Sequence, residues 1–202
     1  MAAIRGVTTT AKVYFFQARH GMTFYVRYDM DADVADPGYP KDIAPHWPGL
    51  WGDRIDAALS WPTTKAYFFR HDEYIRYDMA ADRADSGYPK KISAHWPGLW
   101  ADNISAAVLW NNGKAYFFKG SEYIRYDVAA DRADSGYPKP IAANWPGLWA
   151  DRIDAAFLWE NGKAYFFRGD EYLRYDSASD RSDVGYPKPI QSHWSKLIPE
   201  AI

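Results

Sequence analysis

The chain has 202 residues, of which 24 are Lys or Arg and 26 are Asp or Glu, so its formal net charge is −2. This balance argues against a dedicated nucleic-acid-binding protein, which needs a basic surplus on at least one face. The sequence has no cysteine, and therefore no disulfide, thiolate zinc site or Cys nucleophile. Aromatic residues make up 18% of the chain and hydrophobic residues 48%, a composition that excludes disorder and supports a substantial core.

Targeting signals are not visible in the sequence. No stretch approaches the roughly 18 consecutive apolar residues of a membrane span. The N-terminal residues Met1–Gly6 lack the basic start and long apolar core of a signal peptide. The lack of disulfides permits the cytosol without proving it, so the compartment stays unknown.

A repeat with a period of 49 residues runs through the chain. Gly-Tyr-Pro and a later Trp each recur four times at this step, at Gly38, Gly87, Gly136 and Gly185, and at Trp47, Trp96, Trp145 and Trp194. Tyr-Phe-Phe also recurs, but its first step is 53 residues because the first hairpin is longer, at Tyr14, Tyr67, Tyr116 and Tyr165. A fixed period of this kind determines the architecture.

Each unit is predicted to start with three strands, and the fourth unit illustrates them. Ile153–Trp159 is a short apolar run of strand length, and Asn161-Gly162 after it is a strong hairpin signal. Lys163–Phe167 is aromatic and typical of a strand. Glu171–Asp176 alternates with the period of two that a half-buried strand requires.

The end of each unit is predicted to be extended chain and one helical turn. Tyr186–Ile190 is extended because each proline restricts the residue before it, and Ile190–Trp194 fits a short helix or turn. Units of this length and content are typical of β-propeller blades, not of helical solenoid repeats. A β-solenoid or an open array of hairpins is the alternative, but stacked arrays need atypical capping ends, which the last unit lacks.

The repeated motifs connect the chain to a known family. Ile-Asp-Ala-Ala at Ile55–Ala58 and Ile153–Ala156, Tyr-Phe-Phe-Arg-Gly-Asp-Glu-Tyr-Leu-Arg-Tyr-Asp at 165–176, Gly-Tyr-Pro-Lys and Trp-Pro-Gly-Leu together resemble hemopexin-type repeats. The chain is most similar to free-standing members, such as bacterial pexins and hemopexin-fold seed albumins. The resemblance implies an all-β, four-bladed β-propeller with a short helix per blade. One domain over residues 1–202 is expected, with blades at about 4–51, 55–100, 104–149 and 153–198.

The chain departs from the family pattern in how its ring can close. Members often join the first and last blades by a disulfide, which a chain without cysteine cannot form. Closure is therefore expected to rest on packing against the first blade by three residues near the end of the repeat, Trp194, Leu197 and Ile198.

The first unit has no clear Ile-Asp-Ala-Ala motif. Ile4-Arg5-Gly6-Val7 is the best match, if the first hairpin loop is two residues shorter than the others. An alignment without a gap instead places Ala3 opposite Asp56. The sequence leaves the register of this strand open.

The resemblance implies ions in the central channel, namely calcium or sodium, with chloride as a further possibility. Backbone carbonyls at the inner-strand Asp position would hold the cation, which suits a hard ion that takes oxygen ligands. These residues are Asp56, Ser105 and Asp154, with Arg5 as a weaker fourth. A second carbonyl ring would lie two residues further on, at Ala58, Ala107, Ala156 and Val7. The alternative is that Asp56 and Asp154 only cap strands near a loop.

The histidines fall into two groups. His46, His95 and His193 precede the repeated Trp, and Asn144 replaces His in the third unit, which predicts a shared structural hydrogen bond. His71 and His20 lie in hairpin loops, where an exposed imidazole suits a haem iron.

The repeated loop charges are predicted to be structural. Arg76, Arg125 and Arg174 are expected to pair with nearby carboxylates, and the loop aspartates lack the offsets of an EF-hand. No phosphate-binding loop, dinucleotide-binding glycine pattern or hydrolase motif is present.

The sequence therefore predicts a non-enzymatic ligand-binding protein, a monomer or homodimer that binds neither nucleic acid nor membrane. Haem is the leading ligand and a polyamine, as in a storage-type protein, is the second. A protein-recognition or adhesion module is the alternative. The family is often extracellular.

Overall fold

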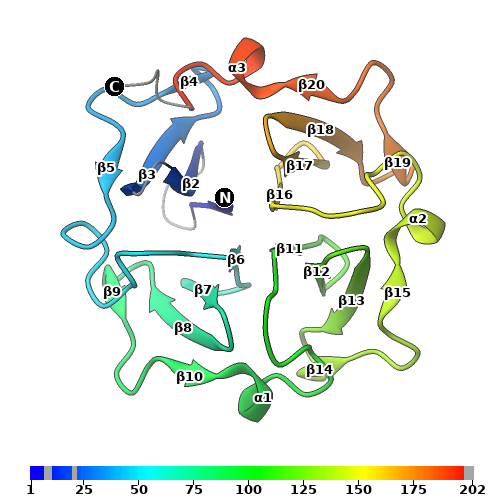
Figure 1. The fold of residues 1–202 in the computed structure, drawn as a ribbon, viewed down its shortest axis with the longest axis horizontal. Helices are drawn as coiled ribbons and strands as arrows, with labels where there is room; N and C mark the ends of the chain where they lie inside the picture. The colour runs from blue at the N-terminus through cyan, green and yellow to red at the C-terminus, as the bar shows by residue number, and fades with distance from the viewer. Residues whose placement is uncertain (7–10, 20–21, 198–202) are drawn as a thin grey trace.

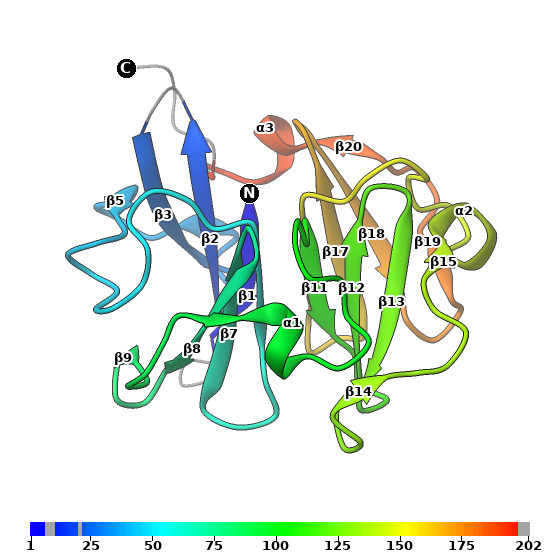
Figure 2. The same ribbon diagram turned by 60° about the horizontal axis from the view of Figure 1, so that its bottom comes forward.

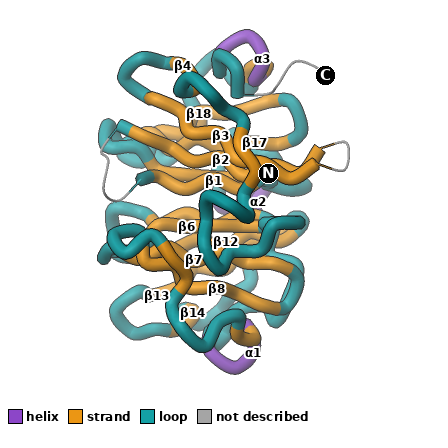
Figure 3. The backbone as a smooth tube through the Cα atoms, turned by 90° about the vertical axis from the view of Figure 1, so that its left-hand side faces the viewer, coloured by secondary structure: helices purple, strands orange, loops and turns teal. Residues whose placement is uncertain are grey.

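The computed structural model describes residues 1–6, 11–19 and 22–197. Four antiparallel sheets stand around a central axis, as Figure 1 shows. The structure thus confirms the predicted four-bladed β-propeller. Seen from the side, the long strands of the first two blades run along the propeller axis (Figure 3).

Each blade uses the same strand order from the axis outward. The first blade contains β1 (Ala2–Arg5), β2 (Lys12–Arg19), β3 (Met22–Asp29), β4 (Val34–Ala35) and β5 (Lys41–Asp42). The second contains β6 (Ala57–Ser60), β7 (Lys65–Arg70), β8 (Glu73–Asp78), β9 (Arg83–Ala84), β10 (Lys90–Lys91) and α1 (Ile92–His95).

The other two blades repeat this order. The third contains β11 (Ala106–Leu109), β12 (Lys114–Lys119), β13 (Glu122–Asp127), β14 (Arg132–Ala133), β15 (Lys139–Pro140) and α2 (Ile141–Asn144). The fourth contains β16 (Ala155–Leu158), β17 (Lys163–Arg168), β18 (Glu171–Asp176), β19 (Arg181–Ser182), β20 (Lys188–Pro189) and α3 (Ile190–His193). Figure 2 shows β11, β12 and β13 side by side in this order.

The helical turn predicted for each unit is present in the last three blades. In the first blade, residues 43–46 form a turn instead. The same backbone hydrogen bond nevertheless ends both forms, because Trp47 N donates to Ile43 O (2.9 Å) just as Trp96 N donates to Ile92 O (3.0 Å). Each turn therefore positions a repeated Trp in the space between two adjacent blades.

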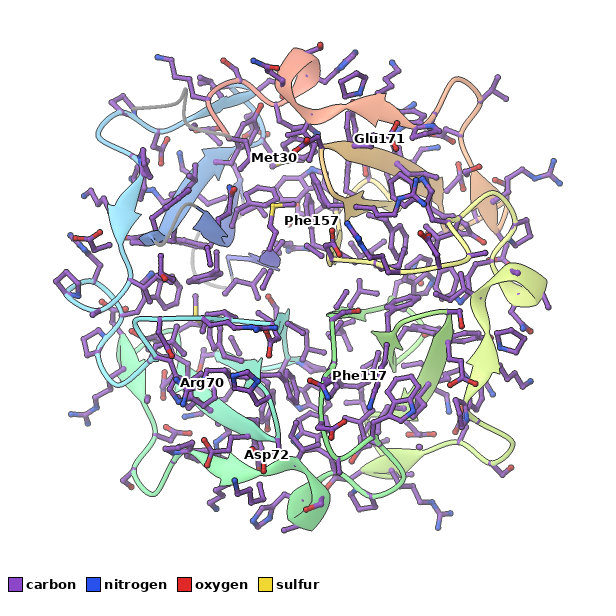
Figure 4. All side chains as sticks on the ribbon, in the orientation of Figure 1. Met30, Arg70, Asp72, Phe117, Phe157 and Glu171 are labelled. Atoms are coloured by element: carbon purple, nitrogen blue, oxygen red, sulfur yellow. The ribbon has the colours of Figure 1, made fainter. Side chains whose placement is uncertain are left out.

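Aromatic side chains fill the spaces between blades. The two Phe residues of each Tyr-Phe-Phe motif point to opposite faces of the sheet, because strand side chains alternate. Each meets a Phe of the adjacent blade edge to face, with ring centroids 5.2 to 5.8 Å apart, in the pairs Phe16–Phe68, Phe69–Phe117, Phe118–Phe166 and Phe167–Phe15. Phe117 and Phe157 are visible among these packed side chains in Figure 4.

The ring closes through the contact that also joins the other blades. Trp194 packs on Phe15, with ring centroids 5.5 Å apart, and Leu197 lies fully buried in the same cluster. Ala35 N donates to Ser195 O (3.1 Å), just as Ala84 N donates to Pro48 O (2.9 Å).

A buried hydrogen bond adds to this closure, since Gln17 Nε2 donates to Leu197 O (2.9 Å). Closure by Trp194 and Leu197 is therefore confirmed, while Ile198 lies outside the described residues.

The first inner strand has a different register from the one predicted. Ile4 pairs with Tyr14, just as Leu59 pairs with Tyr67. Ile4 is therefore equivalent to Leu59, and the hairpin loop between β1 and β2 is two residues longer than that between β6 and β7, not two residues shorter. Both sequence alignments of this strand were wrong.

Candidate functional site

The propeller axis is lined by the free edges of the four inner strands. β6 pairs with β7 alone, so the edge that faces away from β7 has no strand partner. In an antiparallel strand, the N–H and C=O groups of one residue point to the same edge of the strand, and those of the next residue point to the opposite edge. Trp61 N donates to Lys65 O (2.9 Å) in the β6–β7 hairpin, so the groups of Ala58 and Ser60 lie on the free edge.

A first cavity of about 410 Å³ lies where the inner strands begin. Four equivalent positions surround it, one from each blade, and they are Met1, Asp56, Ser105 and Asp154. The structure thus brings three of the predicted first-ring residues together. Arg54, Asn103 and Ala18 also line this cavity, which we call the ion mouth.

Met1, not Arg5, holds the fourth place at the ion mouth. The correct register puts Arg5 opposite Val13, level with Ser60, so that it lines the other end of the channel. Its prediction as an ion ligand was wrong for this reason.

The second ring also changes at its fourth position. Ala3 is equivalent to Ala58, Ala107 and Ala156 by strand register. Val7, the predicted fourth member, lies outside the described residues.

The two acidic side chains of the ion mouth hold the neighbouring hairpin. Asp56 Oδ2 accepts a hydrogen bond from His71 N (2.8 Å), and Asp154 Oδ2 accepts one from Gly169 N (2.7 Å). Arg54 pairs with Asp56 as Arg152 does with Asp154. Both carboxylates thus cap a loop, as the alternative interpretation predicted, and their backbone carbonyls are not needed for these bonds.

Ser105 makes a different bond at the same position. Its Oγ donates to Phe118 O (3.1 Å), within its own hairpin. Among the described residues, no group of three or more His, Asp or Glu side chains is placed to hold a metal ion.

Two of the three histidines before the repeated Trp, His46 and His193, make the same kind of hydrogen bond to a backbone carbonyl four residues earlier. His46 Nδ1 lies 3.0 Å from Asp42 O, and His193 Nδ1 lies 3.2 Å from Pro189 O. Asn144 Nδ2 donates to Pro140 O (2.8 Å) at the same position. This explains why Asn can replace His in the third blade.

Of the two hairpin histidines, His71 lies within the described residues. His71 is exposed in the turn between β7 and β8, with its backbone in the left-handed region at φ 54°. This turn lies at the ion-mouth end, since His71 N donates to Asp56. His20 lies outside the described residues.

The loop charges form one network in each blade. In the second blade, Lys65 Nζ donates to Asp78 (2.8 Å) and Asp85 (2.9 Å), and Arg76 pairs with Asp85 as well. The Lys65 hydrogen bond, followed by that of Ala81 N, lowers the pKa of Asp78 from 3.8 to about 2. The predicted pairing of the strand arginines is thus confirmed in three blades, for Arg76, Arg125 and Arg174.

These repeats can now be compared with known proteins. The model of the family described as Hemopexin matches residues 55–101, 104–150 and 153–197. The chain belongs to the hemopexin family. The first blade lies outside the matched segments, and it is also the blade whose inner strand lacks the repeated motif. No curated protein matches the chain.

Solved structures with the same fold include several plant proteins. The hemopexin-fold protein CP4 from cow pea is 26% identical with a TM-score of 0.81, over 96% of this chain and 94% of that one. A 2S albumin seed protein from Dolichos is 25% identical with a TM-score of 0.79, over 96% and 95%. A plant lectin with two metal binding sites from Cicer arietinum is 23% identical with a TM-score of 0.76, over 99% and 98%, and shows the fold alone.

A second cavity of about 480 Å³ lies at the opposite end of this hemopexin channel, where the inner strands end. Three equivalent indoles line it, and we call them the Trp collar: Trp61, Trp110 and Trp159. Gly6 holds the equivalent place in the first blade. Beside it, Arg5 pairs with Glu160 across the junction of the first and last blades (2.6 Å).

Sequence reasoning missed the Trp collar, although a signal was present. Trp61, Trp110 and Trp159 recur at the 49-residue step, as the buried Trp set does. A second recurring Trp at the end of each inner strand indicates a second aromatic layer. No helix in the described part of the chain is long and apolar enough to cross a membrane.

Proposed function

We propose that this hemopexin-family propeller is a non-enzymatic binding module whose ion mouth holds a cation on the axis. The observation that carries the proposal is that equivalent positions from all four blades surround one cavity, at Met1, Asp56, Ser105 and Asp154. Because Asp56 and Asp154 use their carboxylates to cap loops, ligation falls to the backbone carbonyls. A carbonyl ring also tolerates the change from Asp to Ser in the third blade.

The chemistry of these donors favours calcium, with sodium as the alternative. Calcium accepts backbone carbonyls and water at six to eight positions, so four carbonyls and solvent can complete its shell. The ring at Ala3, Ala58, Ala107 and Ala156 would supply further carbonyl oxygens deeper in the channel. The free-edge N–H groups of the same residues would suit a chloride ion there.

Thermal melting tests this proposal directly. Full-length protein treated with EDTA is melted with added CaCl2, MgCl2 or NaCl at constant ionic strength. An ion that binds only the folded state at 100 times its Kd stabilises it by about 2.7 kcal/mol. For a chain of this length we expect a rise in Tm of roughly 5–10 °C with calcium. Unchanged melting, together with no heat of binding in calorimetry, would refute the ion site.

Haem is a second candidate ligand, and the exposure of His71 favours it. An exposed imidazole on a tight hairpin is accessible to an iron that needs an axial ligand. A haem titration followed at the Soret band should show a low-spin spectrum that the His71→Ala, His20→Ala double variant loses. If that variant keeps the wild-type spectrum, the assignment of these ligands is wrong.

The remaining alternatives separate by simple assays. Spermine should compete with calcium if the ion mouth is a polyamine site, because both cations would then occupy the same cavity beside Asp56 and Asp154. A protein-recognition or adhesion role predicts a macromolecular partner and no response to haem or spermine. Size measurement in solution distinguishes monomer from homodimer.

A further inference from the structure

Two of the hairpins at the Trp-collar end contain the dipeptide Asn-Gly. Asn112-Gly113 lies between β11 and β12, and Asn161-Gly162 lies between β16 and β17. Both asparagines are exposed, and both glycines adopt the positive φ that such turns require, 75° and 76°. Lysine follows each glycine, so the two sites share the tripeptide Asn-Gly-Lys. Any large difference in their reactivity therefore comes from the fold.

An Asn-Gly pair contains its own nucleophile, because the glycine N can attack the side-chain amide before it. Gly113 N bonds to Asn112 Cγ, the Cγ–Nδ2 bond breaks, and Nδ2 leaves as ammonia with the proton that Gly113 N gives up. The product is a five-membered succinimide. Water, the only co-reactant, then opens this ring at either carbonyl to give aspartate or isoaspartate. Glycine favours the attack because it has no Cβ to obstruct it, and the intramolecular geometry keeps the two groups close.

Both hairpins hold the amide in a way that supports this attack. Lys114 N donates to Asn112 Oδ1 (3.0 Å), the oxygen on which negative charge develops as the glycine N adds. Lys163 N makes the equivalent bond to Asn161 Oδ1 (3.0 Å). Each amide also hydrogen-bonds a tyrosine hydroxyl of the strand that follows. The attacked carbonyl is therefore polarised equally at the two sites.

The two sites differ at the attacking nitrogen. Gly162 N donates to Trp159 O (3.1 Å), a bond that closes its turn. Among the residues that the structure describes, Gly113 N donates no hydrogen bond. A nitrogen that donates must break this bond before it can lose its proton and attack, so the fold slows the reaction at Asn161. One net hydrogen bond corresponds to a factor of about two to ten in rate.

We propose that Asn112 is a site of intramolecular deamidation in the folded protein and that it reacts before Asn161. The reaction replaces a neutral amide by a carboxylate, so it adds one negative charge beside the collar cavity, which Asn111 lines. Isoaspartate also adds one backbone carbon atom to the β11–β12 hairpin. Trp110 N donates to Lys114 O (2.8 Å) across this hairpin, so the modification loosens the end of an inner strand.

Peptide mapping by mass spectrometry tests the proposal on full-length protein incubated at pH 8.5 and 37 °C. We expect Asn112 to lose ammonia about two to ten times faster than Asn161 while the protein is folded. In urea that unfolds the chain, the two Asn-Gly-Lys sites should react at nearly equal rates. Asn103, Asn111 and Asn144 precede Ile, Asn and Trp, so they should keep their amides and serve as internal controls.

The Gly113→Ala variant tests the nucleophile. Nothing lies within 4 Å of a Cβ added at Gly113, so the variant should fold, and its methyl group should slow ammonia loss at Asn112 at least tenfold. Asn161 in the same variant should react at the wild-type rate. The proposal is overturned if Asn112 keeps its amide in folded wild type, or if Asn161 reacts as fast. It is also overturned if the difference in rate persists in urea, or if Gly113→Ala leaves the rate at Asn112 unchanged.

Discussion

The junction between the second and third blades depends on a glycine that has no room for a side chain. Gly98 follows Trp96 with a φ of +82°, and Ala133 N donates to the adjacent Pro97 O (2.9 Å). A Cβ atom added to Gly98 would lie 2.7 Å from the Cβ of Ala133 in β14. The Gly98→Ala substitution therefore perturbs both the local backbone and the contact between blades.

The matched control is Gly87→Ala in the same blade. Gly87 has nearly the same φ, +79°, but nothing lies within 4 Å of its added Cβ. A left-handed backbone costs a residue with a Cβ about 1–2 kcal/mol, so both variants lose this amount. Overpacking adds about 1–3 kcal/mol at Gly98 alone. We expect Gly98→Ala to lose about 2–5 kcal/mol in total and Gly87→Ala about 1–2 kcal/mol.

Urea denaturation of both variants measures this difference, and thermal melting supports it. Each kcal/mol should shift the Tm of a chain this size by about 2–4 °C. A second substitution, Ala133→Gly, removes the opposing Cβ and should restore most of the stability that Gly98→Ala loses beyond its control. Equal losses for Gly98→Ala and Gly87→Ala, with no rescue, would refute the account of blade contact.

Three further predictions concern closure, the ion mouth and acid stability. Lys196 occupies the place of Gly98 at the closing junction with φ 62°, so Lys196→Gly should raise the free energy of unfolding by about 0.5–1 kcal/mol in urea; a loss contradicts this. Asp154→Ala removes the bond to Gly169 N and should cost about 1–2 kcal/mol while the calcium shift in Tm persists; loss of that shift would assign ligation to the carboxylate. Because the pKa of Asp78 is about 2 when folded and 3.8 ordinarily, its contribution is complete above pH 4 and declines as the pH falls through 2; denaturation midpoints that stay constant from pH 5 to 2 would exclude it.

The sequence predicts the propeller because the residues that pack between adjacent blades are themselves part of the repeat. The Tyr-Phe-Phe motif and the later Trp meet between every pair of blades, so their period specifies how many sheets surround the axis. The same argument predicts closure by Trp194 on Phe15. These contacts use residues that all four units share.

The first inner strand could not be predicted because its register depends on a loop length. The β1–β2 hairpin carries two extra residues, and the strand retains only small and aliphatic residues of the motif. Met1 therefore stands in the place of Asp56, and Arg5 moves to the opposite end of the channel. The hydrogen bonds of the Asp56 and Asp154 carboxylates could not be predicted from the sequence either. The N–H groups that donate to these carboxylates belong to a hairpin turn fifteen residues further along the chain.

A crystal structure of the protein grown with calcium tests the central claim most directly. Anomalous diffraction should reveal one strong peak on the propeller axis at the ion mouth, about 2.3–2.6 Å from the carbonyl oxygens of Met1, Asp56, Ser105 and Asp154. A peak at the carboxylates of Asp56 and Asp154, or an axis without any ion at millimolar calcium, would contradict the account.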